Sequence, residues 1–176
     1  MTSTPTISIA NTSISNEVMT KIIGGIGTGS STLLGSQLVG VPNSGNKEIR
    51  FGKSVSMSHD GSIVAIGAPR QNMGYDYGEV KVYRFQSGAW VPLGQTISGR
   101  DYYQYIHVSA GQSVSLSSDG TRLAVGFTGV NSVYIFDLNN NNQWTLVGGI
   151  IEGDNPDGDG TAFGHSVSMS LSLIHI

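Results

Sequence analysis

The stretch Gly52-Lys53-Ser54-Val55-Ser56-Met57-Ser58 occurs three times in this chain of 176 residues, with small changes. It returns as GQSVSLS at residues 111–117 and as GHSVSMS at residues 164–170. Ser113 lies 59 residues after Ser54, and Ser166 lies 53 residues after Ser113. A phrase that recurs at this spacing indicates a protein built from repeated structural units, so every other motif has to be interpreted within the repeat.

The best-defined unit, residues 50–99, begins with two predicted strands. Residues 53–58 alternate Ser with Val or Met, which is the period of a β-strand. The turn His59-Asp60-Gly61 then leads into residues 62–68, SIVAIGA. Because these residues are apolar on both faces, they predict a strand that is buried on both sides.

Two further strands complete the unit after a polar loop at residues 69–78. Residues 79–85, EVKVYRF, alternate again, and residues 90–97, WVPLGQTI, form the predicted fourth strand. Pro92 places this fourth strand at an outer edge, since proline cannot donate a hydrogen bond to a ladder.

The second unit, residues 100–153, repeats this order. Trp144 matches Trp90 at a spacing of 54 residues. The four strands that we expect here lie at residues 112–117, 122–127, 132–138 and 144–151.

Partial units flank the two complete ones. Residues 34–40, LGSQLVG, match residues 93–99, LGQTISG, so a lone fourth strand precedes the first complete unit. We therefore interpret residues 33–49 as a partial unit, with residues 1–32 as an N-terminal segment that supplies its outer strands. Residues 154–176 begin a third unit and then break off.

Four antiparallel strands with apolar residues on both faces are typical of a β-propeller blade, which its neighbours must cover. The expected fold class is therefore all-β, a propeller fragment with two complete four-stranded blades and partial blades at each end. Small Ser side chains in the first strand suit the crowded region near the propeller axis. A propeller ring needs about 4–8 blades, so we expect further blades of the same chain, or closure by oligomerisation.

The last six residues do not continue the pattern. After residues 164–170 the repeat calls for an Asp-Gly turn, but the chain reads LSLIHI at residues 171–176. This string resembles translated sequencing-adapter sequence, and we expect it to be foreign to the fold.

The phrases FGKSVSMSHDGSIVAIGAP, at residues 51–69, and FGHSVSMS, at residues 163–170, resemble the FG-GAP repeat. That repeat is known from the heads of integrin α-subunits and from many surface and secreted propellers. Phe51-Gly52 opens the unit, and Gly67-Ala68-Pro69 closes its second strand. The Asp-Gly turn and the Trp strand also resemble WD40-type blades. The second unit departs from the FG-GAP pattern at Ala110-Gly111 and at Gly126-Phe127-Thr128.

This resemblance implies a non-enzymatic binding or adhesion module in an extracellular or cell-surface protein. It also implies a platform for a protein or glycan partner, sometimes with calcium in the loops. Two alternatives remain at the level of the sequence, namely a purely structural repeat region and a propeller hydrolase or lyase. Fold by itself does not decide among them.

Composition excludes several other classes. The nine Lys and Arg residues are scattered along a chain of net charge −3, which argues against a nucleic-acid partner. The absence of Cys excludes disulfides, thiolate nucleophiles and Cys-ligated zinc. No apolar run approaches the ~20 residues of a membrane-spanning helix. No signal-peptide pattern is visible in residues 1–16.

No catalytic residue is predicted. Residues 164–168, GHSVS, resemble the nucleophile elbow G-x-S-x-G but lack its final Gly. The other two units place GKS and GQS at the same position, so the repeat explains the match.

One acidic loop resembles the opening of a calcium-binding loop. Asn155, Asp157 and Asp159 occupy positions 1, 3 and 5, with Gly160 at position 6. Position 12, where such a loop places a bidentate Glu, is Ser166. These three residues are the candidate calcium ligands, and a polar turn between blades is the alternative.

A binding surface is the remaining prediction. In a propeller the loops at residues 69–78 and 98–111 emerge on the same face, and they hold five of the seven Tyr residues. Exposed Tyr and Arg are common anchors for partners, although the Tyr rings would alternatively pack between blades as spacers. The candidate partner-binding residues are Arg70, Tyr75, Tyr77, Arg100, Tyr102, Tyr103 and Tyr105.

Overall fold

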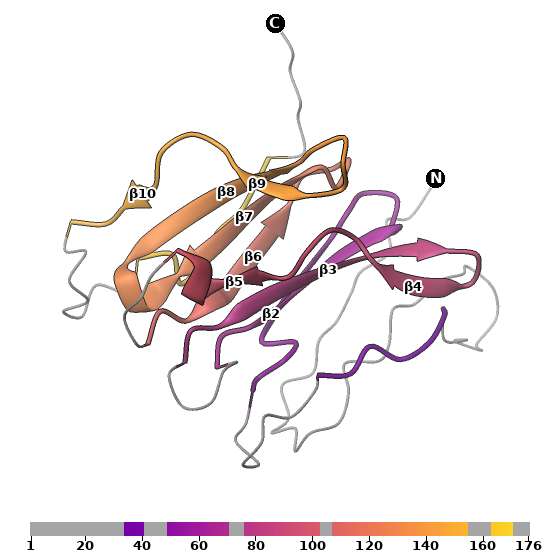
Figure 1. The fold of residues 1–176 in the computed structure, drawn as a ribbon, viewed down its shortest axis with the longest axis horizontal. Coiled ribbons are helices and arrows are strands. Elements are labelled where there is room, and N and C mark those ends of the chain that lie inside the picture. Colours follow the sequence, from indigo (N-terminus) through magenta and orange to yellow (C-terminus); the bar gives the residue numbers. More distant parts are fainter. Residues whose placement is uncertain (1–33, 41–48, 71–75, 103–106, 155–162, 171–176) are drawn as a thin grey trace, which may run out of the picture.

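The computed structural model describes residues 34–40, 49–70, 76–102, 107–154 and 163–170. Within these ranges the chain is all-β, with ten strands, two short 3-10 helices and no α-helix. The strands form two antiparallel sheets that pack side by side and do not close into a ring (Figure 1).

The first sheet has the strand order β1-β2-β3-β4, and β5 also pairs with β3. All six residues of β2 are buried, which confirms the prediction of a strand covered on both faces. Met57 and Val64 lie opposite each other beside the turn at residues 58–62 that joins β1 to β2. The strands are β1 (Ser54–Met57), β2 (Ile63–Ala68), β3 (Glu79–Gln86), β4 (Ala89–Pro92) and β5 (Ile97–Ser98).

The second sheet repeats this arrangement. Ser113 lies opposite Gly126 in the pairing of its first two strands, as Ser54 lies opposite Gly67 in the first sheet. The strands are β6 (Ala110–Leu116), β7 (Arg122–Phe127), β8 (Ser132–Leu138), β9 (Trp144–Leu146) and β10 (Ile151–Glu152). The 3-10 helices η1 (Gly99–Asp101) and η2 (Thr128–Val130) follow β5 and β7.

The prediction of one continuous fourth strand in each unit was wrong. Residues 90–97 divide between β4 and β5, and residues 144–151 divide between β9 and β10. Gly94 and Gly148 lie at the two interruptions with φ of 78° and 72°. This left-handed conformation turns the backbone out of the ladder, and Gly adopts it without steric cost. Both fragments of each fourth strand still pair with the third strand of their sheet.

One continuous core joins the two sheets. Ile63 and Ala65 of β2 belong to a buried cluster that includes side chains of the second sheet, such as Leu123 and Trp144. Val64 and Ile66 belong to a separate cluster, and Leu38, from residues 34–40, packs against it. Strand β2 is therefore covered on one side by the second sheet and on the other by residues 34–40.

Candidate functional site

The first serine of the first two Ser-Val-Ser phrases donates a hydrogen bond to the next unit. Ser54 Oγ donates to the carbonyl oxygen of Gly111 at 2.8 Å. Ser113 Oγ donates to the carbonyl oxygen of Gly164 at 2.6 Å. The third copy of the phrase therefore contacts the second sheet in the way that the second sheet contacts the first.

The second serine of the phrase accepts a hydrogen bond from the next unit. Ser56 Oγ accepts from the backbone N–H of Leu116 at 2.8 Å. Ser115 Oγ accepts from the backbone N–H of Met169 at 2.9 Å. Each of the first two phrases thus satisfies one donor and one acceptor on the backbone of its neighbour.

The contact between units also requires glycine. A Cβ atom at Gly67 would lie 3.0 Å from the carbonyl carbon of Gly111 and closer still to its oxygen. A Cβ atom at Gly126 would meet the carbonyl of Gly164 in the same way, again at 3.0 Å from the carbon. The backbones approach this closely because neither residue carries a side chain.

The strand tryptophans make a third recurring contact. Trp144 Nε1–H donates to the carbonyl oxygen of Leu93 at 2.9 Å, and Trp90 Nε1–H donates to that of Leu34 at 3.0 Å. The side-chain amide of Gln95 adds two bonds, donating to the carbonyl of Trp144 at 2.7 Å and accepting from its N–H at 2.9 Å. Residues 34–40 thus contact the first sheet in the same way that residues 93–99 contact the second, by accepting the indole hydrogen bond.

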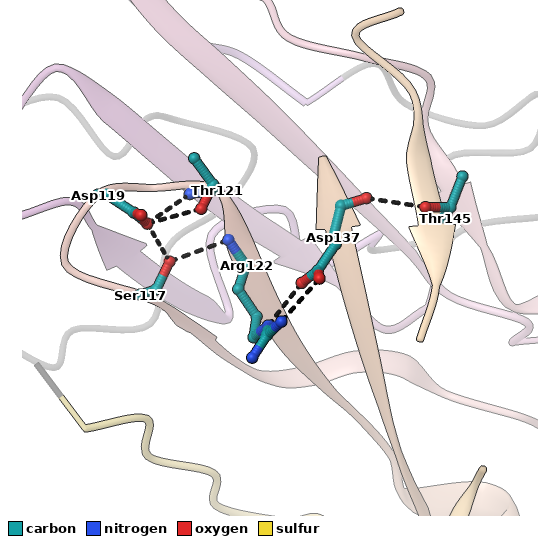
Figure 2. Close-up of polar contacts among 6 residues, drawn as sticks. All are labelled: Ser117, Asp119, Thr121, Arg122, Asp137 and Thr145. Atoms are coloured by element: carbon teal, nitrogen blue, oxygen red, sulfur yellow. Dashed lines mark hydrogen bonds and ion pairs between the residues drawn. The ribbon is translucent and has the colours of Figure 1, made fainter. Parts of the chain in front are cut away.

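The Asp-Gly turns are held by the same hydrogen bonds in both sheets. Asp119 accepts from Ser117 Oγ at 2.7 Å, from Thr121 Oγ1 at 2.8 Å and from Thr121 N–H at 3.0 Å (Figure 2). Ser117 Oγ accepts in turn from Arg122 N–H at 2.9 Å. Burial works to raise the pKa of Asp119, but the bonds from Ser117 and Thr121 outweigh it and lower the pKa.

The first sheet has the equivalent turn. Asp60 accepts from Ser58 Oγ at 2.7 Å and from Ser62 N–H at 3.0 Å. The bond from Ser58, followed by those from Ser62, lowers the pKa of Asp60 to about 2. Both carboxylates are therefore ionised at neutral pH and serve as caps of their turns, which does not suit a general acid.

An ion pair ties the strands of the second sheet beside this turn. Arg122 Nε donates to Asp137 Oδ1 at 2.6 Å, and Nη2 donates to Oδ2 at 2.7 Å (Figure 2). Thr145 Oγ1 donates to the carbonyl oxygen of Asp137 at 3.2 Å and extends the link to β9. Because this pair is exposed to solvent, it contributes little to stability.

The described parts of the two loops predicted to share one face lie at the same end of the first sheet. Gly99 N–H donates to the carbonyl of Gly78 at 3.0 Å, and Ala110 N–H donates to that of Tyr77 at 2.9 Å. These bonds join the loop after β2 to the segment between the sheets. We call this end, where β2 ends and β3 begins, the loop end.

Three of the predicted partner-binding residues lie at the loop end in different environments. Arg70 and Arg100 are exposed, and Tyr77 is half-buried. The other predicted residues Tyr75, Tyr103 and Tyr105, together with the candidate calcium ligands Asn155, Asp157 and Asp159, lie outside the described residues.

Tyr102 packs against the aromatic core of the second sheet. Its ring centroid lies 5.4 Å from that of Tyr134, 5.5 Å from Phe136 and 6.0 Å from Phe127. Burial raises the pKa of its hydroxyl. This packing favours the interpretation of Tyr102 as a spacer between units over that of a partner anchor.

The prediction overlooked a polar row at the loop end. Lys53, Gln112 and His165 are the middle residues of the three Gly-x-Ser motifs, and they belong to three successive units. Gln112 Nε2 lies 3.4 Å from His165 Nε2. Lys53 and His165 are exposed. Aligning the three phrases in the sequence is enough to identify these positions.

The described part of the chain has neither a cluster of metal-ligating side chains nor a membrane-spanning helix. It contains no group of three or more His, Asp or Glu residues that would hold a metal ion. Among the same residues no helix is long and apolar enough to cross a membrane. In comparisons with known proteins, the chain matches no family model and no curated protein.

Proposed function

We propose that the chain is part of a β-propeller of the FG-GAP type and acts as a non-enzymatic binding or adhesion module. The observation that carries this proposal is the recurrence of one set of contacts between successive units. It comprises the serine bonds, the glycine approach and the tryptophan bond to a carbonyl.

A recurring contact has a geometric consequence. When each unit meets the next through equivalent atoms, each is related to the next by a similar rotation, and a repeated rotation builds a curved array. Four-stranded sheets arranged around an axis in this way are propeller blades. The segments at residues 34–40 and 163–170 extend the array by part of a unit on each side.

The first serines of two repeated phrases and the aspartates of the two Asp-Gly turns support a non-enzymatic role. The hydroxyls of Ser54 and Ser113 donate to backbone carbonyls, so neither is activated by an adjacent base. Asp60 and Asp119 are engaged in their turns. A structural purpose therefore accounts for each of these groups.

We place the binding surface at the loop end. Arg70 and Arg100 are exposed there, and Lys53, Gln112 and His165 each precede the first serine of a repeated phrase at the same end. Guanidinium, ammonium and amide groups bind carboxylates and sulfates through directed hydrogen bonds. The expected partner is a protein or glycan that presents acidic groups.

The test is a binding screen of the 176-residue chain on arrays of neutral, sialylated and sulfated glycans and of acidic peptides. We expect binding to acidic probes, and at least about a tenfold loss in the double variant Arg70→Ala, Arg100→Ala. The matched control is Arg84→Ala, because Arg84 pairs with Ile63 at the opposite end of the sheet. Equal losses in the control and the double variant would contradict the proposed surface.

Two further measurements address the alternatives. Turnover in a panel of hydrolase and lyase substrates would refute the non-enzymatic role. Thermal unfolding with and without EDTA tests the calcium loop of Asn155, Asp157 and Asp159, and a lower melting temperature in EDTA that added calcium restores would assign calcium to the chain.

A further inference from the structure

The middle residue of each Gly-x-Ser motif follows a glycine with a left-handed backbone. Gly52, Gly111 and Gly164 have φ of 86°, 84° and 79°. Because the same backbone turn precedes each middle residue, the three side chains of the polar row leave their units in similar directions. Lys53 is exposed although the complete second sheet follows its unit, so exposure belongs to this position of the repeat.

A β-bulge directs one member of the polar row toward the next unit. The pairing of β6 with β7 shifts between Ala110 and Ser113, so that Gly111 and Gln112 form the bulge. A bulge interrupts the regular alternation of side chains along a strand and re-aims one of them. The amide nitrogen Nε2 of Gln112 lies 3.4 Å from Nε2 of His165. The polar groups of the second and third units therefore meet at the loop end.

The hydrogen bonding of this pair depends on the proton of the imidazole. In neutral histidine one ring nitrogen donates and the other accepts. With the proton on Nδ1, Nε2 of His165 accepts from the amide of Gln112. In protonated histidine both ring nitrogens donate, so the amide N–H loses its acceptor. Proton uptake by His165 therefore adds a positive charge and releases an amide donor at the same place.

Few charged groups surround this pair in the described part of the chain. The third phrase and β6 contain no other charged residue, and β7 and β8, which pack against the third phrase, carry only Arg122 and Asp137. Those two bind each other at the opposite end of the sheet. Glu152 and Asp154 are exposed next to the third phrase, and neither forms an ion pair with His165. The charge of a protonated His165 is therefore left for a ligand.

We propose that Gln112 and His165 bind one sulfate group of a glycan, and that this binding tightens when His165 takes up a proton. The terminal oxygens of a sulfate accept hydrogen bonds from several directions, which suits single donors that come from two units. A carboxylate is matched best by the planar fork of an arginine, which the polar row lacks. Lys53 adds the attraction of an exposed ammonium group. The proposal rests on the binding surface proposed at the loop end and names the group that this surface recognises.

The experiment is a calorimetric titration of the full 176-residue chain with a sulfated oligosaccharide, with the desulfated form as the ligand control. Titrations at about pH 7.5 and about pH 5.5, at constant ionic strength, span the interval in which histidine ordinarily changes its charge. We expect binding at least about threefold tighter at the lower pH, because a charged donor strengthens the hydrogen bond to sulfate. Heats measured in two buffers of different ionisation enthalpy should show net proton uptake on binding.

Three variants separate the roles of the side chains. His165→Gln retains an amide but cannot take up a proton, so it should lose both the pH dependence and the proton uptake. Gln112→Leu removes the amide and should weaken binding by about threefold at both pH values. His59→Gln is the matched control and should keep both effects, because His59 is exposed in the turn at the opposite end of the first sheet.

The outcomes distinguish this proposal from the one on which it rests. Circular dichroism at both pH values checks each fold, and His165→Asn replaces His165→Gln if the latter unfolds. Absence of binding at both pH values would overturn both proposals. Binding that keeps its pH dependence in His165→Gln, while Arg70→Ala, Arg100→Ala still weakens it, would overturn this proposal alone. Equal affinity for the desulfated form, or tighter binding of an acidic peptide, would overturn the assignment to a sulfated glycan.

Discussion

Gly67→Ala isolates the close approach between the sheets. A Cβ atom here would lie 3.0 Å from the carbonyl carbon of Gly111, and closer to its oxygen and to Ser54 Oγ. Ordinary contact begins at 3.4 Å, and the atoms in the way are mainly backbone. The sheets would therefore have to separate by about 1 Å, and overpacking of this kind costs about 1–3 kcal/mol or more.

The net effect combines this cost with a smaller gain. Replacing Gly by Ala in a strand recovers about 0.5–1 kcal/mol of backbone entropy. Because a rigid backbone faces the new methyl group, the strain belongs at the upper end of its range, and we expect a net loss of about 2 kcal/mol. For a chain of this size that lowers the melting temperature by about 4–8 °C.

Thermal unfolding followed by circular dichroism measures the effect. Gly149→Ala is the matched control, because nothing lies within 4 Å of a Cβ atom there. We expect it to be neutral or slightly stabilising. Adding Ser54→Ala to Gly67→Ala should relieve the strain only in part, since the Gly111 carbonyl remains. A Gly67→Ala protein with the same melting temperature as the wild type would refute the close approach between the sheets.

The remaining predictions concern single side chains. Trp144→Phe removes the buried indole bond to Leu93 and should cost about 1–3 kcal/mol by denaturant unfolding, whereas an unchanged midpoint would argue against that bond. The folded pKa of Asp60, about 2, lies below its ordinary value of 3.8. The stability that ionised Asp60 contributes is therefore present above pH 3.8 and is lost as the pH falls towards 2. Asp60→Asn should flatten this acid dependence when melting temperatures are measured at several pH values. A double-mutant cycle on Arg122 and Asp137 should give about 0.2–1 kcal/mol, decreasing with added salt, and a larger salt-independent coupling would be unexpected.

The sequence predicted the strands well where the pattern is strict. The limits of β7 and β8 are those expected at residues 122–127 and 132–138, because turn residues bound each run sharply. The fourth strands were less predictable. Their residues favour a strand throughout, but Gly94 and Gly148 adopt a left-handed backbone conformation that local pattern alone does not require.

The candidate site was less accessible to sequence reasoning than the fold. The pattern indicated that the loops holding Arg70 and Arg100 share one end, and backbone bonds join those loops there. It left open whether Tyr102 is an anchor or a spacer, because an aromatic residue in a loop suits both roles. Three ring contacts now favour the spacer.

What the sequence determined by itself is the unit: its strand order, its turns and the burial of its second strand on both sides. These follow from periodicities of a few residues and from the repetition of a phrase, which are local properties of the chain. How the units meet depends on contacts between residues that lie far apart in the sequence. The Ser54 and Ser56 bonds join atoms 57 and 60 residues apart in sequence, and small polar residues carry no local sign of such partners. Their partners follow from how close the two sheets lie.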